Sequence, residues 1–288
     1  RDLSTKEDKA RQFSCPQCGA PVAVALDSTK SVTCGSCDSV IDLTQGIGGE
    51  LRFARQNEPV QPLIPLGSVG KLQGVDWQVV GFQHRVGQEP GDDEVFGWSE
   101  YLLYEASAGY RWIVEDEGVW RFVTPVSVGD VDTSGLPGRV QYDNKRYRLR
   151  NANAARVDLV LGEFYWRVEV GETVDARDFV AGDEVLSCES SGDEVNWSLG
   201  RAMPTAPLFR SLGLPMPVPP MTMSGLSDDE GASSDVSSNI GSVVVVILMV
   251  VGFVVLGVLS ETLSGGSSSG GYSGGHGSSG WSGGFGGK

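Results

Sequence analysis

Four cysteines in two pairs are the residues whose spacing most clearly indicates chemistry. Cys15 and Cys18 form one CxxC pair, and Cys34 and Cys37 form a second pair, separated from the first by fifteen residues. Two tight turns at this spacing can present four thiolates to one tetrahedral Zn²⁺. We therefore expect a structural zinc site. A pair of disulfides, which suits an oxidising compartment, and redox chemistry of a CxxC pair are the alternatives.

A small zinc ribbon is the fold that these pairs predict. Gly19 and Gly35 follow ligand positions where the chain must turn sharply, and residues 21–26 and 31–33 can form the short strands. Because four thiolates close the coordination sphere, such a site leaves no position for a substrate and instead holds a small module together. The fifth cysteine, Cys188, stands alone and is interpreted as a small core residue.

Candidate catalytic groups outside the cysteine pairs are few. The chain has two histidines, and His276 lies in a Gly/Ser-rich tail, so a histidine-based nucleophilic triad would depend on His84. No phosphate-binding GxxxxGK[ST] motif and no GxGxxG motif before a helix occurs. Two carboxylates could meet across a barrel as acid and base, although carboxylates more often cap turns, pair with arginine or face water. The carboxylates considered are Glu100, Glu115, Glu163 and Glu189.

One stretch of basic residues stands out in a chain whose formal net charge is −15. Strand alternation places Arg146, Arg148 and Arg150 on one face, opposite Tyr147 and Leu149. A solvated strand face is the first interpretation, and an anionic partner such as a phospholipid headgroup is the second. The acidic surroundings argue against nucleic acid. The whole cluster consists of Lys145, Arg146, Arg148, Arg150 and Arg156.

Alternating apolar and polar residues predict a mainly β module in the middle of the chain. Apolar residues at every second position mark strands around Trp77, Trp112 and Trp166. Residues 140–142 and 145–150 flank an Asp-Asn pair that suits positive φ, which predicts a hairpin. Short strands with polar turns and no convincing amphipathic helix indicate an antiparallel barrel or sandwich.

Aromatic residues are frequent in this module, and two roles are open for them. Period-two spacing is what a small β-barrel needs to fill its interior, so we expect most of them in the core. A groove for a small molecule or a peptide is the alternative. The residues concerned are Trp98, Tyr101, Tyr104, Tyr110, Trp112, Trp120 and Trp166.

An uncharged run near the C-terminus predicts a transmembrane helix. Residues 240–260 are 21 consecutive uncharged positions. As a helix they span about 31 Å, against about 30 Å for the hydrocarbon core of a bilayer. Residues 1–11 are polar and contain no apolar signal-peptide stretch, which places the preceding domains in the cytoplasm. We therefore expect a single-pass protein of the inner (cytoplasmic) membrane with its N-terminal domains in the cytoplasm.

Shifts in composition divide the chain into six segments. Proline marks a linker after the ribbon and a tether after the β module. A faint echo between residues 110–123 and 164–180 is compatible with duplication of one β unit, with halves at 70–125 and 139–210, and equally with chance alternation. The expected segments are a zinc ribbon at 1–55, a linker at 56–66, the β module at 67–212, a disordered Pro/Ser/acidic tether at 213–239, the transmembrane helix at 240–260 and a Gly/Ser-rich tail at 261–288.

Several ordered motifs of the β module carry a family resemblance. They are residues 70–82 (GKLQGVDWQVVGF), 98–104 (WSEYLLY), 109–115 (GYRWIVE), 162–168 (GEFYWRV), 186–189 (LSCE) and 194–198 (EVNWS). Together they resemble the bacterial family catalogued as domain of unknown function 4178 over about residues 67–212, and the N-terminal ribbon suits that family. The family has no established activity. The resemblance implies encoding beside membrane-stress components: phage-shock ESCRT-III-like proteins, small integral membrane proteins and polyamine-synthase-like enzymes. It supplies no catalytic residue.

A membrane-anchored, non-catalytic adaptor is the function that these observations favour. It would recruit protein partners, among them phage-shock ESCRT-III-like or small integral membrane proteins, during envelope stress or membrane remodelling. The alternative is an enzyme or small-ligand-binding protein with a carboxylate-lined pocket in the β module. Clustering of Glu100, Glu115, Glu163 or His84 in one pocket would favour the enzyme, and scatter would favour the adaptor.

Overall fold

The computed structural model describes residues 11–45, 50–53, 60–88 and 95–217, which all fall within one structural unit. The expected transmembrane helix at 240–260, the tail at 261–288 and nearly all of the tether at 213–239 lie outside the described residues. No helix in the described part of the chain is long and apolar enough to cross a membrane.

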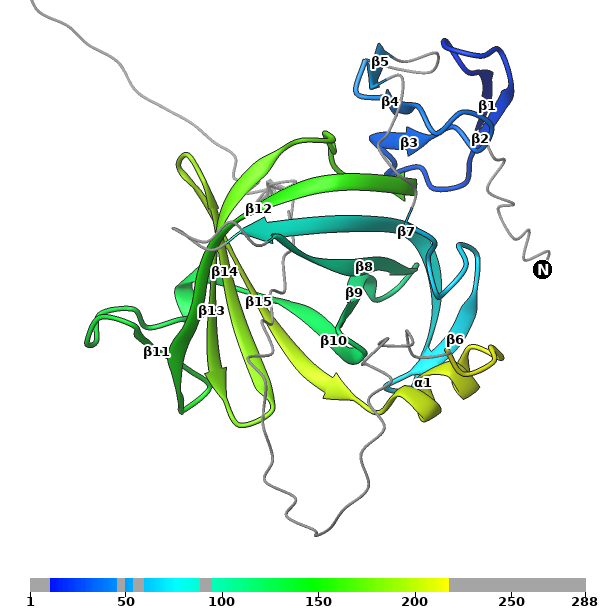
Figure 1. Ribbon diagram of the computed structural model, residues 1–288. Helices are drawn as coiled ribbons and strands as arrows, with labels where there is room; N and C mark the ends of the chain where they lie inside the picture. The colour runs from blue at the N-terminus through cyan, green and yellow to red at the C-terminus, as the bar shows by residue number, and fades with distance from the viewer. Residues whose placement is uncertain (1–10, 46–49, 54–59, 89–94, 218–288) are drawn as a thin grey trace, which may run out of the picture. The chain divides into compact units, whose positions relative to one another are not determined.

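The first five strands form an N-terminal ribbon (Figure 1). β1 (Arg11–Ser14) pairs antiparallel with β2 (Pro21–Val24). A second antiparallel group contains β3 (Ser31–Thr33), β4 (Val40–Asp42) and β5 (Glu50–Phe53), and β3 also pairs with a strand of the following module. The short strands expected between the two cysteine pairs therefore form, and one of them, β3, joins the ribbon to the rest of the protein.

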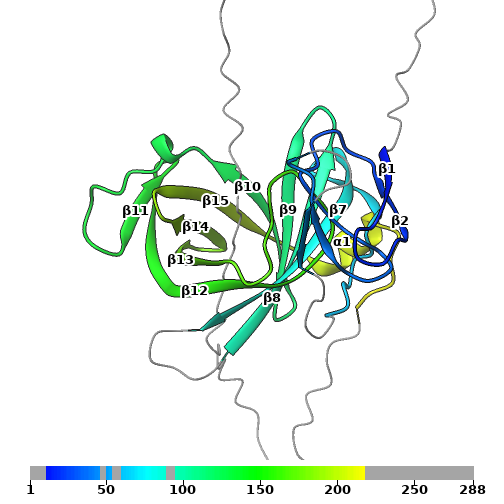
Figure 2. The same ribbon diagram turned by 90° about the horizontal axis from the view of Figure 1, so that it is seen from above.

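Eight antiparallel strands close into a barrel (Figures 1 and 2). Their order around the ring is β7-β8-β9-β10-β15-β14-β13-β12, and pairing of β12 with β7 closes it. The closed ring decides between the barrel and the sandwich that the sequence left open. The ring strands are β7 (Val75–Gln88), β8 (Val95–Glu105), β9 (Gly109–Asp116), β10 (Val119–Val126), β12 (Lys145–Phe164), β13 (Thr173–Ala181), β14 (Glu184–Ser191) and β15 (Glu194–Met203).

Two short strands extend the sheet beyond the ring. β6 (Val69–Leu72) pairs with β7, and β11 (Arg139–Tyr142) pairs with β12. The turn between β11 and β12 consists of Asp143 and Asn144, with φ of 46° and 58°. Positive φ at both central residues is the geometry of a two-residue hairpin turn, so the predicted hairpin is confirmed.

The ring divides into two four-stranded meanders, β7–β10 and β12–β15. The segments with similar sequence occupy different places in them. Residues 110–123 span the β9–β10 hairpin, whereas residues 164–180 span the connection from β12 to β13 and most of β13. The echo therefore pairs elements that are not equivalent in the topology, and it adds no support for a duplication.

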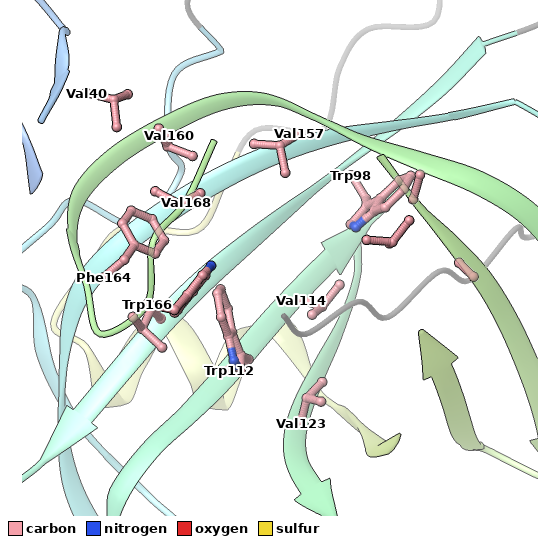
Figure 3. Packing of buried hydrophobic residues seen from close by; sticks show 14 of the residues in the cluster. Val40, Trp98, Trp112, Val114, Val123, Val157, Val160, Phe164, Trp166 and Val168 are labelled. Carbon is pink, nitrogen blue, oxygen red and sulfur yellow. The ribbon is translucent and has the colours of Figure 1, made fainter. Parts of the chain in front are cut away.

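Aromatic and branched side chains fill much of the barrel interior. Figure 3 shows Trp98, Trp112 and Trp166 with the valines that surround them. The indole rings of Trp112 and Trp166 are 5.5 Å apart, and that of Trp166 is 4.9 Å from the ring of Phe164. Tyr101 and Trp120 are also buried, on the outer side of the sheet, while Tyr104 and Tyr110 are half-buried. The expectation that most of these aromatics are core residues is confirmed.

The expectation of a strand across Phe164–Val170 is wrong. β12 ends at Phe164, and the following residues belong to no strand. Phe164, Trp166 and Val168 are nevertheless buried at alternate positions, because this extended segment packs into the barrel core. Apolar alternation here reflects packing of one side of an extended chain and not membership of a sheet.

Outer faces of the barrel are covered as well. α1 (Thr205–Ser211), a helix that the sequence analysis did not foresee, buries Leu208 and Phe209 against the β7–β10 half, where Phe209 makes an edge contact with Trp120 at 5.2 Å. Seven residues are too few to show helical periodicity, which is why the pattern gave no signal. On the other half, Val140 and Tyr147 of the β11–β12 hairpin pack in the cluster of Phe179 and Trp197.

Candidate functional site

The four thiols of the two CxxC pairs lie together in the ribbon. Their sulfur atoms are all within 4.8 Å of one another, with 3.8 Å between Cys15 and Cys37 and 3.7 Å between Cys18 and Cys34. A tetrahedral ion with metal–sulfur bonds of about 2.3 Å places its ligands about 3.8 Å apart. A disulfide would require about 2.05 Å, and all four cysteines are free. The cluster is compatible with a four-thiolate metal site.

Backbone hydrogen bonds give the two cysteine loops the same shape. Gly19 donates its N–H to the carbonyl of Cys15, and Asp38 donates to that of Cys34, both at 2.9 Å. Gly19 has φ of 75° and Asp38 has φ of 55°. The sharp turn therefore follows the second cysteine of each pair, and Asp38 takes the role that the sequence analysis assigned to Gly35.

Ser39 favours the ionised form of one ligand. Its hydroxyl lies 3.2 Å from Sγ of Cys37, and hydrogen bonds from the side chain and backbone of Ser39 lower the pKa of Cys37 to about 7. Since the thiolate is the form that binds metal, Ser39 favours the metal-binding form of Cys37, whereas hydrogen bonds with neighbouring thiols and burial raise the pKa of Cys18.

The ribbon is joined to the barrel by the side chain of Glu163 on β12. Its carboxylate accepts hydrogen bonds from the backbone N–H groups of Ala25 at 2.8 Å and Leu26 at 3.1 Å, and from the hydroxyl of Thr29 at 2.6 Å. Beside it, Glu163 and Phe164 pair with Val32 and Ser31 of β3. Glu163 is therefore committed to holding the loop between β2 and β3.

Further polar contacts continue this junction. Arg167 forms an ion pair with Asp42 of β4 at 3.1 Å, and the hydroxyl of Thr33 donates to the carbonyl of Val160 at 3.1 Å. The hydroxyl of Ser28 is hydrogen-bonded to that of Tyr110. These contacts therefore hold the module that contains the two cysteine loops against the barrel.

The other groups proposed as acids or bases are dispersed. His84 faces Asp158, with 3.9 Å between Nδ1 and a carboxylate oxygen, and burial lowers the pKa of His84 despite that carboxylate. Glu115 accepts a hydrogen bond from the N–H of Gly118 in its own turn at 2.8 Å. Glu100 lies inside the barrel. These three and Glu163 do not share a pocket.

Two carboxylates do meet inside the barrel, around an arginine that the sequence analysis did not single out. Arg85 Nη1 lies 2.9 Å from Glu189 and 4.0 Å from Glu100, and both Arg85 and Glu100 are fully buried. Glu100 also accepts hydrogen bonds from Gln83 at 2.5 Å and from the indole N–H of Trp98 at 2.6 Å. Burial outweighs the attraction of Arg85 and raises the pKa of Glu189 to about 7.

The space beside this cluster is small. A cavity of about 50 Å³ is lined by Glu189, Glu172 and Asn196, among others. That volume accommodates one or two water molecules, each of which occupies about 30 Å³ in the liquid. The cluster therefore resembles a buried ionic network more than a substrate pocket.

The basic cluster does not act as one unit. Lys145 forms an ion pair with Glu184 at 2.9 Å, and Arg156 one with Asp158 at 3.5 Å. Arg146 and Arg148 are exposed on the hairpin, opposite Gln141 and Arg139 of β11. The exposed arginines of the hairpin therefore include Arg139, which the sequence analysis missed, whereas Arg156 of the predicted cluster pairs elsewhere. Arg150 of the predicted face is exposed and lies at a register shift between Leu149 and Asn151.

A four-cysteine ribbon fixed on a closed eight-stranded antiparallel barrel is the class of protein that these observations define. Residues 65–205 match the model of a family described as Domain of unknown function (DUF4178). The match covers all eight ring strands and leaves out the ribbon. No curated protein and no solved structure matches the chain in the corresponding comparisons.

Proposed function

We propose that this protein is a non-catalytic adaptor, anchored in the cytoplasmic membrane by residues 240–260, that recruits protein partners to the cytoplasmic face during envelope stress or membrane remodelling. The observation that carries the proposal is the dispersal of His84, Glu100, Glu115 and Glu163 into four different environments. Each of these groups has a local structural partner, which supports a binding role over catalysis.

Zn²⁺ is the metal that we propose for the cysteine cluster. Four thiolates in tetrahedral array are the ligand set of structural zinc sites, and they leave no position open for a substrate. The residues that would hold the ion are Cys15, Cys18, Cys34 and Cys37. The ion would stabilise the ribbon. The hydrogen bonds of Glu163 would hold the loop between β2 and β3 of that ribbon against the barrel.

The competing hypothesis is an enzyme or ligand-binding protein with a carboxylate-lined pocket. Glu100 and Glu189 are its best candidates, since they approach the same guanidinium group of Arg85. The buried guanidinium of Arg85 balances the charge of one of these carboxylates. The adjacent cavity of about 50 Å³ has no room for an organic substrate.

Site-specific photocrosslinking tests the adaptor proposal. A photoreactive residue is placed in the full chain, in native membranes, at Val69 or Val95, which are 55% and 58% exposed. We expect a discrete protein adduct from at least one of these positions, and loss of that adduct when the ribbon is disrupted by Cys34→Ser. Absence of any adduct, together with a turnover activity that Glu189→Gln abolishes, would favour the enzyme.

A further inference from the structure

The segment between β10 and β11 folds over the outside of the barrel and leaves a crevice beneath it. β11 lies outside the ring of strands (Figure 2). Under residues 133–140 is a cavity of about 320 Å³ whose floor consists of Phe179, Cys188 and Trp197 from β13, β14 and β15. The rings of Phe179 and Trp197 are 5.7 Å apart. This floor is apolar and belongs to the outer face of the sheet.

Basic side chains border the same crevice. Arg139 and Arg177 both line it, and both are exposed. Within the described residues, neither arginine forms an ion pair or a side-chain hydrogen bond. A second cavity of about 210 Å³ shares Leu136 and Arg139 with the crevice, and Arg146 and the carboxylate of Asp132 also line it. Cations that lack protein partners beside an apolar floor match a ligand with an anionic head and an apolar body.

The rim of the crevice carries an exposed apolar residue. Leu136 is 68% exposed, the highest value among the large exposed hydrophobic residues of the described chain, and it borders both cavities. Leu149, in the adjoining strand, is 42% exposed. An apolar tip flanked by several arginines is the pattern of surfaces that insert into the headgroup region of anionic membranes.

A peptide is the less suitable occupant, because the outer edge of β11 is already in use. Gln141 exchanges two backbone hydrogen bonds with Asp132, both at 2.9 Å, and the N–H of Arg139 donates to the carbonyl of Leu136 at 3.0 Å. A peptide that adds as a strand needs free main-chain groups at such an edge. A lipid needs none of them.

We propose that the crevice beneath residues 133–140 binds an anionic phospholipid of the membrane surface, with Arg139 and Arg177 at the headgroup and Phe179 and Trp197 against the acyl chain. This site is additional to the adaptor role, and it would remain if no protein partner existed. It also gives a physical reason for a basic hairpin in a chain of net charge −15, since the acidic remainder is repelled by an anionic bilayer.

Cys188 supplies a reporter for occupancy of the crevice. It lines the cavity, it is 9% exposed, and it is the one cysteine outside the cluster. Burial raises the pKa of Cys188 to about 11, so its alkylation is slow and is best followed at mildly alkaline pH. The full chain, with its metal, is reconstituted in nanodiscs of phosphatidylcholine, with and without phosphatidylglycerol, and alkylation of Cys188 by N-ethylmaleimide is timed by mass spectrometry.

The expected result is slower alkylation in the presence of phosphatidylglycerol. Each of the changes Arg139→Gln and Arg177→Gln should weaken this protection about fivefold, the effect of one basic residue near an anionic surface. Leu136→Asn should weaken it without a change of charge. Arg156→Gln is the matched control, because Arg156 is half-exposed but pairs with Asp158 away from the crevice, and it should leave protection intact.

Three outcomes would overturn the proposal. They are equal alkylation rates in the two lipids, protection that survives the Arg139→Gln/Arg177→Gln double change, and equal protection by inorganic phosphate in phosphatidylcholine alone. Protection by an acidic soluble protein in place of phosphatidylglycerol would assign the crevice to a peptide. Each variant is first compared with the unchanged chain by thermal unfolding, so that a folding defect is not mistaken for lost binding.

Discussion

Glu163 of β12 accepts a 2.6 Å hydrogen bond from the hydroxyl of Thr29, in the loop that connects the two cysteine pairs. The same carboxylate accepts from the N–H groups of Ala25 and Leu26. The side chain of Glu163 therefore binds two residues, Ala25 and Leu26, that lie 138 and 137 positions earlier in the chain. The order of the cysteine loops and the position of the barrel strand depend on each other.

Replacement of Glu163 should release the ribbon without unfolding the barrel. Glu163→Ala removes three hydrogen bonds to a charged acceptor, each worth about 1.5–3 kcal/mol when buried and less here because the carboxylate is partly accessible. We expect a loss of about 2–3 kcal/mol in local stability. Hydrogen exchange at the amides of Ala25 and Leu26 should accelerate at least about tenfold, with exchange in β9 unchanged. Glu117→Gln, an exposed carboxylate in the β9–β10 turn, is the control. Equal acceleration in both variants would contradict this role for Glu163.

Metal removal should unfold the ribbon selectively. The full chain should contain one zinc ion, and a chelator should abolish exchange protection in β2, β3 and β4 while the barrel strands retain theirs. Cys34→Ser should lose the metal, because Cys34 is one of the four clustered thiols. Cys188→Ser, which changes the one cysteine outside the cluster, should retain it. Metal analysis that finds no zinc, or equal loss in both variants, would refute the site.

The pattern of cysteines and turns carried enough information to predict local structure. Two CxxC pairs fix their own loops, since ligand spacing alone determines which atoms can meet, and the Asp-Asn pair fixes a turn through its tolerance of positive φ. Both features depend on residues close in the chain. The alternation around Trp77 and Trp112 indicated strands for the same reason.

The pattern of residue types could not predict contacts between residues that are far apart in the chain. A single sequence gives Glu163 the same appearance as any surface carboxylate, and only the antiparallel pairing of β12 with β3 reveals its partners. Arg85 reads as an outward-facing strand residue, because charged residues are rarely buried. In the closed ring the side chain of Arg85 lies inside the barrel, where it meets Glu100 and Glu189 from other strands. The residues of β8 from Trp98 to Leu103 are buried on both faces of the strand, which likewise results from tertiary packing.

Two glycines with the same backbone angle test how tightly β12 packs on β7. Gly162 and Gly171 both have φ of 88°. A side chain at either position bears the strain of the left-handed region, about 1–2 kcal/mol. At Gly162 an added methyl group would also overlap the carbonyl oxygen of Val80, whereas at Gly171 nothing lies within 4 Å. We expect Gly162→Ala to cost about 1–3 kcal/mol more than Gly171→Ala in the free energy of unfolding. Equal losses in urea denaturation would show that β12 shifts to make room.

Burial of Glu189 should make the free energy of unfolding fall as pH rises, because it raises the pKa of this carboxyl despite the attraction of Arg85. The folded-state pKa of Glu189, about 7, lies above the value of 4.5 for the free side chain. Between these values the folded protein holds a proton that the unfolded chain releases, so ionisation favours unfolding progressively from about pH 4.5 to about pH 7 and adds nothing further above that. Glu189→Gln keeps an acceptor for Arg85 and cannot ionise. The free energy of unfolding of the unchanged chain, relative to this variant, should therefore decrease across that interval.

Glu194→Gln, an exposed change in the same cavity wall, should leave the original pH profile in place. A profile that Glu189→Gln does not flatten would mean that Arg85 keeps Glu189 ionised in the folded protein, and that Glu172, whose pKa is also raised by burial, carries the proton instead.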